Sequence, residues 1–528
     1  MSEKFDVIVV GAGHNGLIVA AYLSKAGLNV CVVEEQPEVG GGTKTKELTV
    51  PGFKHDCCSS LHYILIANPM MKNDELGLLS EYGLEYARTE KLTGEIFEDG
   101  STIKFYLDID KTCESIAKIS PHDAEAYREF NAKAGKSLEM FTTGMYGPPA
   151  TAGIAQALMN QSPEGQALLR AQSLSAWDIA EEWFESDKLK IALSRFASKA
   201  MNNPFDKGTG FGFITILPFM NRFGGWMPVG GSGALAEALK RCLEAHGGTV
   251  KINSMVKQFK ISGGEVSGVI LSSGEEILAG KAVVANINIK QIFSGMLPGV
   301  ELPTNLERNV SRLHQSRYSG FIQHIALNEK PKFKVGSDIG DFLFVEFGHM
   351  NIKHYRNAMH RMDLGYLDNE FSNFCIPTLI DPSRAPAGKT IVYHYALVPP
   401  VLKDAPVEKW DEMGQQTADN MLEIARRYCS NLTDDNIIGR SYVTPLDIQR
   451  RNSAMPAGDK YHFGMYNWQI GGNRPLSGMH MYRMPINKLY MSGSSTHPGG
   501  GVTGGGRVAA QVVMEDLGID FEKVIKGN

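Results

Sequence analysis

The stretch that decides the fold is FDVIVVGAGHNGLIVAAYLSKAGLNVCVVE, Phe5 to Glu34. It opens with a short apolar run, Phe5 to Val10, whose composition is typical of a buried strand. A glycine-rich turn follows, and then a segment of helical periodicity that stops at Gly27, a residue suited to the end of a helix. A second apolar run, Asn29 to Val33, ends at Glu34. This order of strand, glycine turn, helix, strand and acid predicts a dinucleotide-binding βαβ unit.

Each part of this unit has a physical role in holding a nucleotide. Gly11 permits a tight turn, Gly13 lets the backbone approach a pyrophosphate, and Gly16 lets helix and strand pack closely. The start of the helix offers free N–H groups and a partial positive charge to phosphates. Glu34 would accept hydrogen bonds from ribose hydroxyls and disfavours a 2′-phosphate, so NADP is not expected. The predicted contacts are Gly11, Gly13, His14, Asn15, Gly16 and Glu34.

Composition narrows the class of protein. The 528 residues suggest about three or four units, or one large enzyme that runs them together. Charge is nearly balanced, with 53 Lys+Arg against 58 Asp+Glu, which argues against a nucleic-acid partner bound through a broad basic surface. Glycine is enriched at 56 residues, above the usual share of about 7%, and it is clustered. Such clusters indicate backbone held close to a ligand.

The ends of the chain and its cysteines indicate where it works. The first strand begins within a few residues of Met1, which leaves no room for a signal peptide, and no apolar run reaches the ~18 residues of a membrane span. Seven cysteines, with Cys57 and Cys58 adjacent, do not resemble a disulfide framework. We therefore expect a cytoplasmic protein with reduced thiols. The histidines at 349, 354 and 360 lack the spacing of a helical zinc pair, and no metal site is expected.

A second glycine cluster follows the acid, and here the sequence resembles a known family. The run from Val30 to Thr43, V-x-V-V-E-x-x-x-x-V-G-G-G-T, resembles the extended signature of FAD flavoproteins of the amine oxidase and phytoene desaturase group. The form GAGHNGLIVAAYLSKAG is most similar to phytoene dehydrogenase-like oxidoreductases. The resemblance implies FAD as cofactor, with further contacts from Glu35, Gly41, Gly42 and Thr43. Family members often carry arginine at the positions of Gln36 and Gly42, and its loss here removes positive charge near the phosphates.

Two distant segments complete the resemblance. The first, Gly224 to Gly233, precedes a helix and a strand-like run to Val256, whose backbone the resemblance places against the adenine. Glycine pairs at 263–264 and 273–274 then predict hairpin turns. The second is LYMSGSSTHPGGGVTGGGRVAA, which predicts a strand from Leu489 to Ser492, an open loop and a helix from about Arg507. The resemblance points this helix's N-terminus at the flavin pyrimidine ring, where reduced flavin carries negative charge. The cofactor contacts expected from it are Gly493, Gly501 and Val502.

The remaining chain is expected to bind the substrate. The pattern of 76–223 is largely helical, whereas 301–480 mixes strands and helices, with strands at Tyr318–Leu327 and Thr390–Val398. The apolar run 209–228 could form part of the hydrophobic core, line a channel for an apolar substrate or lie on a membrane surface. We predict an α/β fold: a discontinuous, Rossmann-like FAD-binding domain (1–75, 224–300 and 481–528) with an inserted α+β substrate-binding domain (76–223 and 301–480).

The chemistry follows from the cofactor. A second strand–GxGxxG–helix unit for NADPH is absent from the sequence, so electrons are expected to leave to an external acceptor, oxygen or a quinone. Two histidines are the candidate bases: His497, in the glycine loop, and His62, which follows the stretch Asp56-Cys57-Cys58-Ser59-Ser60. Each of them could instead orient a loop or bond to FAD. The leading hypothesis is a dehydrogenase or desaturase that introduces C=C bonds into a small apolar or alicyclic substrate by hydride transfer to flavin N5.

Three alternatives stay open at this stage. They are an amine-type oxidase that produces hydrogen peroxide, a redox-neutral flavin isomerase, and a non-catalytic FAD-binding partner protein. Peripheral membrane contact and the oligomeric state also stay open.

Overall fold

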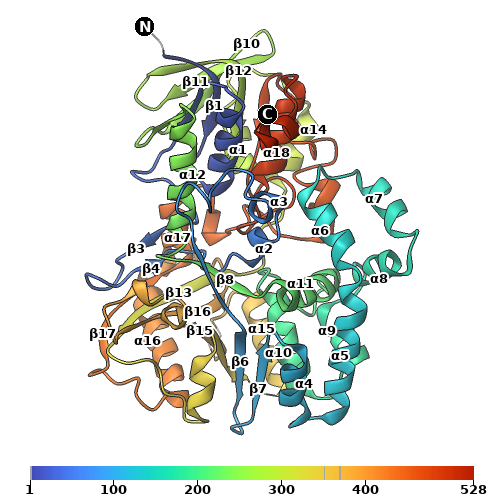
Figure 1. Cartoon of the computed structure of the whole chain (residues 1–528), viewed down its shortest axis with the longest axis vertical. Coiled ribbons are helices and arrows are strands. Elements are labelled where there is room, and N and C mark those ends of the chain that lie inside the picture. Colours follow the sequence, from blue (N-terminus) through green and yellow to red (C-terminus); the bar gives the residue numbers. More distant parts are fainter. Residues whose placement is uncertain (1–2, 350, 368–369, 528) are drawn as a thin grey trace.

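The computed structural model describes residues 3–349, 351–367 and 370–527, and their backbone forms two stacked lobes (Figure 1). The upper lobe contains a sheet of order β10-β11-β12-β1-β2-β9, with β18 paired to β12. Its parallel strands are β1 (Glu3–Val10), β2 (Val30–Val33), β9 (Thr249–Lys251), β12 (Glu276–Ala285) and β18 (Leu489–Met491). Strands β10 (Val256–Ser262) and β11 (Glu265–Leu271) extend it as antiparallel hairpins, which confirms the predicted turns.

Helices cover both faces of this sheet. On β1, Val7 and Val9 point to one face and Ile8 and Val10 to the other, and all four are buried. Core residues of α1 (His14–Lys25), α12 (Gly233–Ala245) and α18 (Gly506–Asp516) pack beside Val7 and Val9. Those of α13 (Ile289–Phe293) and α14 (Thr304–Ser311) pack beside Ile8. The βαβ unit predicted from 5–34 is therefore confirmed.

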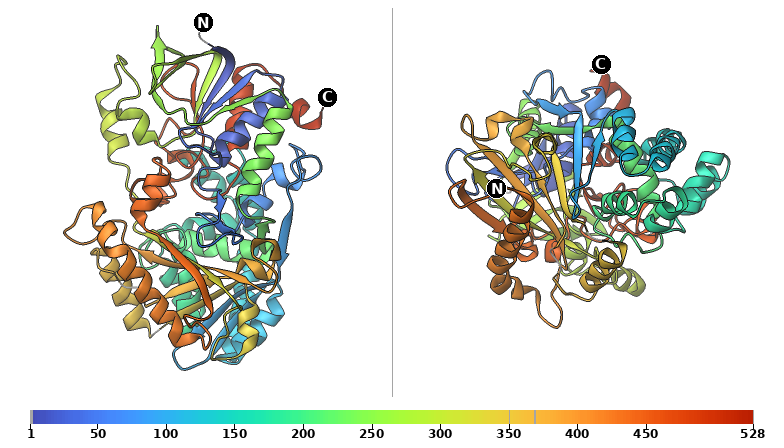
Figure 2. Two further views of the ribbon diagram at one scale, coloured as in Figure 1. Left: turned by 90° about the vertical axis from the view of Figure 1, so that its left-hand side faces the viewer. Right: turned by 90° about the horizontal axis from the view of Figure 1, so that it is seen from below.

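The lower lobe contains the second sheet, of order β17-β13-β16-β15-β14-β6-β7. Its bounds are β6 (Lys91–Phe97), β7 (Thr102–Tyr106), β13 (Ser319–Leu327), β14 (Phe344–His349), β15 (Ser372–Cys375), β16 (Thr390–Val398) and β17 (Ile437–Val443). Strands β13 and β16 confirm the prediction within a residue. Helix α16 (Trp410–Tyr428) packs its Met421 and Ala418 against Phe321 of this sheet (Figures 1 and 2).

The segment 76–223 differs at its start from the largely helical pattern that its sequence predicts. It first supplies the β6–β7 hairpin and β5 (Tyr86–Thr89), which pairs with β8 (Gly225–Pro228). The helices follow and stand to one side of the second sheet when seen from below (Figure 2). They are α4 (Ile109–Ala117), α5 (Pro121–Gly135), α6 (Leu138–Tyr146), α7 (Ala152–Met159), α8 (Pro163–Ala171), α9 (Ala176–Trp183), α10 (Asp187–Ser198) and α11 (Gly210–Phe223).

Helix α11 accounts for most of the apolar run 209–228. It buries Phe213, Leu217 and Phe219 in its interior-facing positions, so the run forms core along most of its length. Within 3–349, 351–367 and 370–527, none of the helices has both the length and the apolar character needed to cross a bilayer.

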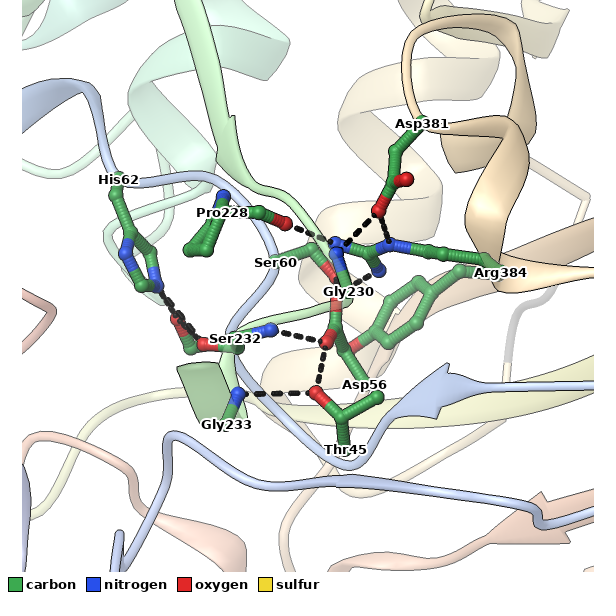
Figure 3. Close-up of polar contacts among 12 residues, drawn as sticks. Thr45, Asp56, Ser60, His62, Pro228, Gly230, Ser232, Gly233, Asp381 and Arg384 are labelled. Carbon is green, nitrogen blue, oxygen red and sulfur yellow. Dashed lines mark hydrogen bonds and ion pairs between the residues drawn. The ribbon is translucent and has the colours of Figure 1, made fainter. Parts of the chain in front are cut away.

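A buried ion cluster joins the two lobes (Figure 3). Arg384, in a short 3-10 turn (Pro382–Arg384) after β15, pairs with Asp56 at 2.5 Å and with Asp381 at 3.0 Å. Asp56 ends β4 (His55–Asp56), which pairs with β3 (Thr45–Lys46), and it accepts hydrogen bonds from the Ser232 amide and the Thr45 hydroxyl. Chain segments from three distant parts of the sequence therefore meet at one guanidinium.

The packing does not follow the predicted domain limits at every point. Part of the range 301–480, which is predicted to bind the substrate, packs in the core formed with β1, β11 and β12 of the first sheet. The residues concerned are Val310, Leu313, Phe463 and Met479. The division into a cofactor and a substrate domain stays a prediction.

Candidate functional site

The two glycine turns predicted to hold a cofactor lie against each other. Gly13 and Gly40 form a parallel bridge, and the Gly40 amide donates to the Ala12 carbonyl at 2.8 Å. A Cβ placed on Gly41 would lie 3.0 Å from the Gly13 Cα, so the turns approach this closely because neither carries a side chain. Their backbone forms an open edge at the carboxyl ends of β1 and β2, which is where a dinucleotide fold binds its ligand.

A cavity of about 390 Å³ lies along this edge. The residues predicted to bind the cofactor that line it are Gly11, Gly13, His14, Asn15, Glu34, Glu35, Gly41, Gly42, Val256 and Gly493. The cavity therefore brings together residues from both ends and the middle of the sequence. Lys44 and Ser494 also line it, which extends it from the acid after β2 to the loop after β18.

The other predicted residues lie outside the cavity wall. A Cβ on Gly16 would lie 2.2 Å from the Gly11 carbonyl oxygen, so Gly16 serves close packing, as predicted. The Thr43 hydroxyl donates to the Gly40 carbonyl at 2.7 Å and closes the second turn. Val502 is buried in the core shared by α1, α12 and α18. Gly501 has a φ of +92°, a conformation that favours glycine.

Glu34 shapes the turn as well as facing the cavity. One of its carboxylate oxygens accepts the Ala12 amide at 2.7 Å and the other accepts the Gln36 amide at 2.9 Å. Burial raises the pKa of Glu34, and the two amide hydrogen bonds oppose that shift. Each oxygen keeps a further lone pair, so ribose hydroxyls can still donate to this carboxylate.

The beginning of α1 offers the cavity an unpaired polar atom. The His14 Nε2 atom is buried and has no hydrogen-bond partner among the described residues. Burial lowers the pKa of His14 to about 4, so the ring is neutral at pH 7. The neighbouring Asn15 instead accepts the Gly506 amide at 3.1 Å, which ties α1 to the beginning of α18.

Sequence reasoning missed several residues of the cavity wall. Asn286, directly after β12, donates to the Gly11 carbonyl at 3.1 Å, and a Cβ on Gly493 would lie 2.3 Å from its Oδ1 atom. Asn286 thus lies between the first glycine turn and the loop after β18, and it contacts both. Its position at the carboxyl end of the strand next to β1 was the signal that could have revealed it. Arg451, Met455 and His462 also line the cavity and come from the range 301–480.

The positive charge near the glycine turns is modest. Lys44, which lines the cavity, has its ammonium 3.6 Å from a carboxylate oxygen of Glu38. Arg451 lies at the exposed end of α17 (Pro445–Arg451) and also lines the cavity. Together with Lys257, which lines the cavity as well, these side chains supply the positive charge of the cavity wall.

The two candidate bases are both buried; neighbours engage both ring nitrogens of His62, whereas the Nδ1 atom of His497 has no hydrogen-bond partner among the described residues. His62 has its Nε2 atom 2.8 Å from the Ser232 hydroxyl (Figure 3). Its Nδ1 atom lies 2.9 Å from the Tyr86 hydroxyl, and burial lowers its pKa to about 3. His497 donates from Nε2 to the Gly144 carbonyl at 2.8 Å, and burial lowers its pKa to about 4. Neither lines the cavity described above. Their catalytic role stays a prediction.

The cavity fits a flavin adenine dinucleotide. Side-chain-free backbone from two turns faces the middle of the cavity, a carboxylate stands at one end, and the loop that precedes α18 stands at the other. The orphaned Nε2 atom of His14 also needs a partner that the described residues do not supply. Such a donor and acceptor set suits a ligand with two phosphates and a ribose at one end.

Comparison with known proteins agrees with this geometry. Residues 9–70 match the model of an NAD(P)-binding Rossmann-like domain. The chain is 28% identical to one of the subunits of limonene dehydrogenase from Castellaniella defragrans, over 99% of this chain and 97% of that protein. It is 26% identical to a lycopene-forming phytoene desaturase of Pseudescherichia vulneris, over 97% and 99% of the two chains.

Solved structures share the fold. Cyclohexylamine oxidase from Brevibacterium oxydans superposes with a TM-score of 0.58 at 16% identity, over 97% of this chain and 99% of that chain. The paired glycine turns, the acid after β2 and the full-length similarity to dehydrogenases and desaturases together show an FAD-dependent oxidoreductase that is similar to phytoene desaturases.

Proposed function

We propose that this enzyme removes hydrogen from a CH–CH unit of a small apolar or alicyclic substrate and leaves a C=C bond. The observation that carries the proposal is the cofactor cavity, built from the two glycine turns, Glu34 and the loop after β18. The dehydrogenase and desaturase names of the full-length relatives support the reaction type, and limonene and phytoene in those names support an apolar substrate.

The chain's own residues bind and orient the cofactor. The Glu34 carboxylate would hold the ribose, and the turn amides with the N-terminus of α1 would hold the phosphates. The loop after β18, which lines the other end of the cavity through Gly493 and Ser494, would lie beside the flavin ring system. When bound, the flavin supplies the acceptor for two electrons and a proton.

We propose that the substrate binds beside the same loop, next to its aromatic neighbours. A Cβ on Gly500 would lie 1.8 Å from the ring of Tyr461, so Tyr461 packs directly on the loop after β18. The Lys460 ammonium lies 5.7 Å from the centre of that ring and 5.5 Å from the centre of the Tyr395 ring. Rings of this kind exclude water and contact apolar substrates without demanding hydrogen bonds.

A spectroscopic experiment tests the reaction type. The purified protein is expected to be yellow, and anaerobic addition of limonene or phytoene is expected to bleach the flavin band in a single turnover. Cyclohexylamine is the matched amine. Bleaching by the amine with a burst of peroxide in air would favour the amine-type oxidase, whose fold this chain shares. Conversion of a substrate only after prior flavin reduction, with no acceptor consumed, would select the isomerase.

The electron acceptor is a separate part of the proposal. We expect electrons to leave to oxygen or a quinone, and mixing the oxidised enzyme with NADPH is expected to leave the flavin oxidised on the timescale of turnover. Rapid stoichiometric bleaching by NADPH in a stopped-flow instrument would contradict this. Location in the cytoplasm and contact with a membrane surface stay predictions.

The candidate bases are tested by pH–rate profiles. Because the pKa values of His62 and His497 are about 3 and about 4, neither ring is expected to produce an inflection between about pH 6 and about pH 8. His62→Ala and His497→Ala are therefore expected to change rate or stability without changing the shape of the profile. Loss of an inflection near neutral pH in either variant would instead assign that histidine as the base.

A further inference from the structure

Arg474 is a fully buried arginine that lies against the loop after β18. Among the described residues its guanidinium donates to backbone carbonyls alone, including Ser494 at 2.9 Å, Gln469 at 3.1 Å and Tyr461 at 2.7 Å. The face of the guanidinium lies 3.9 Å from the centre of the Phe463 ring. The side chain has no exposed surface, and the contacts made by its guanidinium are to neutral groups.

No carboxylate forms an ion pair with Arg474 within the described ranges. The acid with the strongest influence is Asp459, whose carboxylate is engaged by the Ser316 hydroxyl at 2.9 Å and amide at 2.8 Å and by the Tyr461 amide at 3.0 Å. Burial lowers the pKa of Arg474 to about 9, so the side chain still carries its charge at pH 7. The protein thus retains a buried positive charge with no direct counter-charge.

Arg384 is a second fully buried arginine, and its ion pairs can be compared with the surroundings of Arg474. Arg384 is also fully buried, yet it is paired with two carboxylates, Asp56 and Asp381 (Figure 3). An unpaired buried charge is costly, and buried charges in proteins are therefore usually paired or bound to a ligand of opposite sign. The contrast indicates that the partner of Arg474 is absent from the polypeptide itself.

The charge of Arg474 acts on the cofactor cavity. Ser494, whose carbonyl binds the guanidinium, lines the cavity, and so does His462. The charge helps to lower the pKa of His462, which is about 3, and of His497, about 4, although burial is the larger cause for both. Its field therefore reaches both the cavity wall and the loop after β18.

We propose that Arg474 supplies the positive charge that stabilises the reduced, anionic flavin and so raises the reduction potential of the bound cofactor. The inference rests on the proposed function, because it needs FAD with its ring system at the Ser494 end of the cavity. Transfer of a hydride from a substrate C–H bond gives the ring two electrons and one proton, hence one net negative charge. The second substrate hydrogen leaves as a proton, which is released to the solvent. A nearby cation lowers the free energy of the charged product and leaves the neutral oxidised ring almost unaffected.

The test compares three proteins that differ at one position. Wild type, Arg474→Lys and Arg474→Met are purified with FAD, and their midpoint potentials are measured anaerobically against a reference dye, with no substrate present. Arg474→Met is expected to lower the equilibrium constant for reduction by about tenfold to a hundredfold, a fall of about 30 to 60 mV. Arg474→Lys keeps the charge and is expected to stay within about threefold of wild type.

Two controls separate charge from structure. Arg384→Lys loses guanidinium hydrogen bonds at an equally buried site, so it is expected to lower stability without lowering the potential. Titration of each apoprotein with oxidised FAD gives a second readout, because a purely structural role would weaken FAD binding in both Arg474 variants and leave the potential unchanged. That pattern would overturn the inference.

Wild type alone supplies a further test if Arg474→Met does not fold. If Arg474 stabilises the anion, reduction takes up one proton for every two electrons at all pH values above about pH 6. The midpoint potential is then expected to decrease with rising pH at the slope of one proton per two electrons. A slope of two protons per two electrons across that range would overturn the inference. A wild-type protein that binds no FAD would contradict the proposed function, whereas a protein that binds FAD with a potential insensitive to Arg474→Met contradicts only the inference.

Discussion

Glu34 is a residue that serves the fold and the cofactor with the same atoms. Its two oxygens accept the Ala12 and Gln36 amides, which fixes the path of the chain around the first glycine turn, and the same carboxylate lines the cavity. A glutamine at this position would have only one side-chain oxygen, so it could not accept the two amides with two separate oxygens.

Glu34→Gln is therefore expected to weaken FAD binding by about tenfold to a hundredfold, because the new NH2 group would face an N–H donor and lose one charge-assisted hydrogen bond. Quenching of flavin fluorescence during titration of the apoprotein measures the dissociation constant. Glu47→Gln, at an exposed glutamate outside the cavity, is the matched control. Equal affinity of Glu34→Gln and wild type would show that the carboxylate does not contact the ribose.

Sequence reasoning found the residues whose partners are local. Gly11, Gly13 and Glu34 lie within one βαβ unit, where spacing alone fixes their relation. Asn286 directly follows a strand, but this position points to the cavity only once the order of the strands in the sheet is known. His462 reaches the same cavity through loop packing, and no local pattern marks it. The same holds for Arg474, whose importance comes from its burial and its missing counter-charge.

Among the elements, the approach of α1 and α18 shows how glycine sets the distance between helices. The Gly506 amide donates to the Asn15 side chain, and a Cβ on Gly506 would lie 2.3 Å from the Asn15 carbonyl oxygen. Because Asn15 stands at the first turn, this contact also fixes where the N-terminus of α18 points relative to the cavity.

Gly506→Ala is expected to lower the free energy of unfolding by about 1 to 3 kcal/mol, because the methyl group forces the two helices apart. Gly153→Ala is the matched control: this helical glycine of α7 has nothing within 4 Å of its Cβ position, and the same substitution is expected to stabilise by about 1 kcal/mol. Urea denaturation of both variants with FAD in fixed excess measures the effects. A neutral or stabilising Gly506→Ala would contradict the close approach.

The strands show where element prediction succeeds and fails. Strands β13 and β16 are long and continuous, and they are buried at every position except Tyr395, so composition and length identify them. Strand β6, KLTGEIF, contains Gly94 and two charged residues and has no such signal. It is stabilised by pairing in parallel with β14, whose first residue is Phe344, and a partner so distant in sequence is not visible locally.

At the scale of the whole molecule, the Asp56–Arg384–Asp381 cluster holds the two lobes together. Arg384→Met is expected to lower the free energy of unfolding by about 3 to 5 kcal/mol, because it leaves Asp56 buried and unpaired. Thermal unfolding measures the loss. Arg440→Met removes a surface partner of Asp419 and is expected to cost less than about 1 kcal/mol, which makes it the matched control. Equal losses in the two variants would contradict the role of the cluster.

The buried histidines couple the stability of the whole chain to pH. Burial is the largest cause that lowers the pKa of each of six of them: to about 4 in His14, His55 and His497, and to about 3 in His62, His394 and His462. An unfolded histidine titrates near 6.5, so below that value the unfolded chain binds more protons than the folded one. Stability from these groups is therefore complete above pH 6.5 and is lost as pH falls through the folded pKa values.

Between about pH 6.5 and about pH 4.5, each such histidine is expected to remove about 1 kcal/mol of stability per pH unit. Urea denaturation of the FAD-bound protein at several pH values measures the slope. His394→Gln, which lies in β16 and outside the cavity wall, is expected to reduce that slope by the share of one histidine, whereas His360→Gln, at an exposed position, leaves the buried set intact. A slope unchanged by His394→Gln would mean that this ring is already protonated in the folded state. The acid sensitivity would then have to come from other groups.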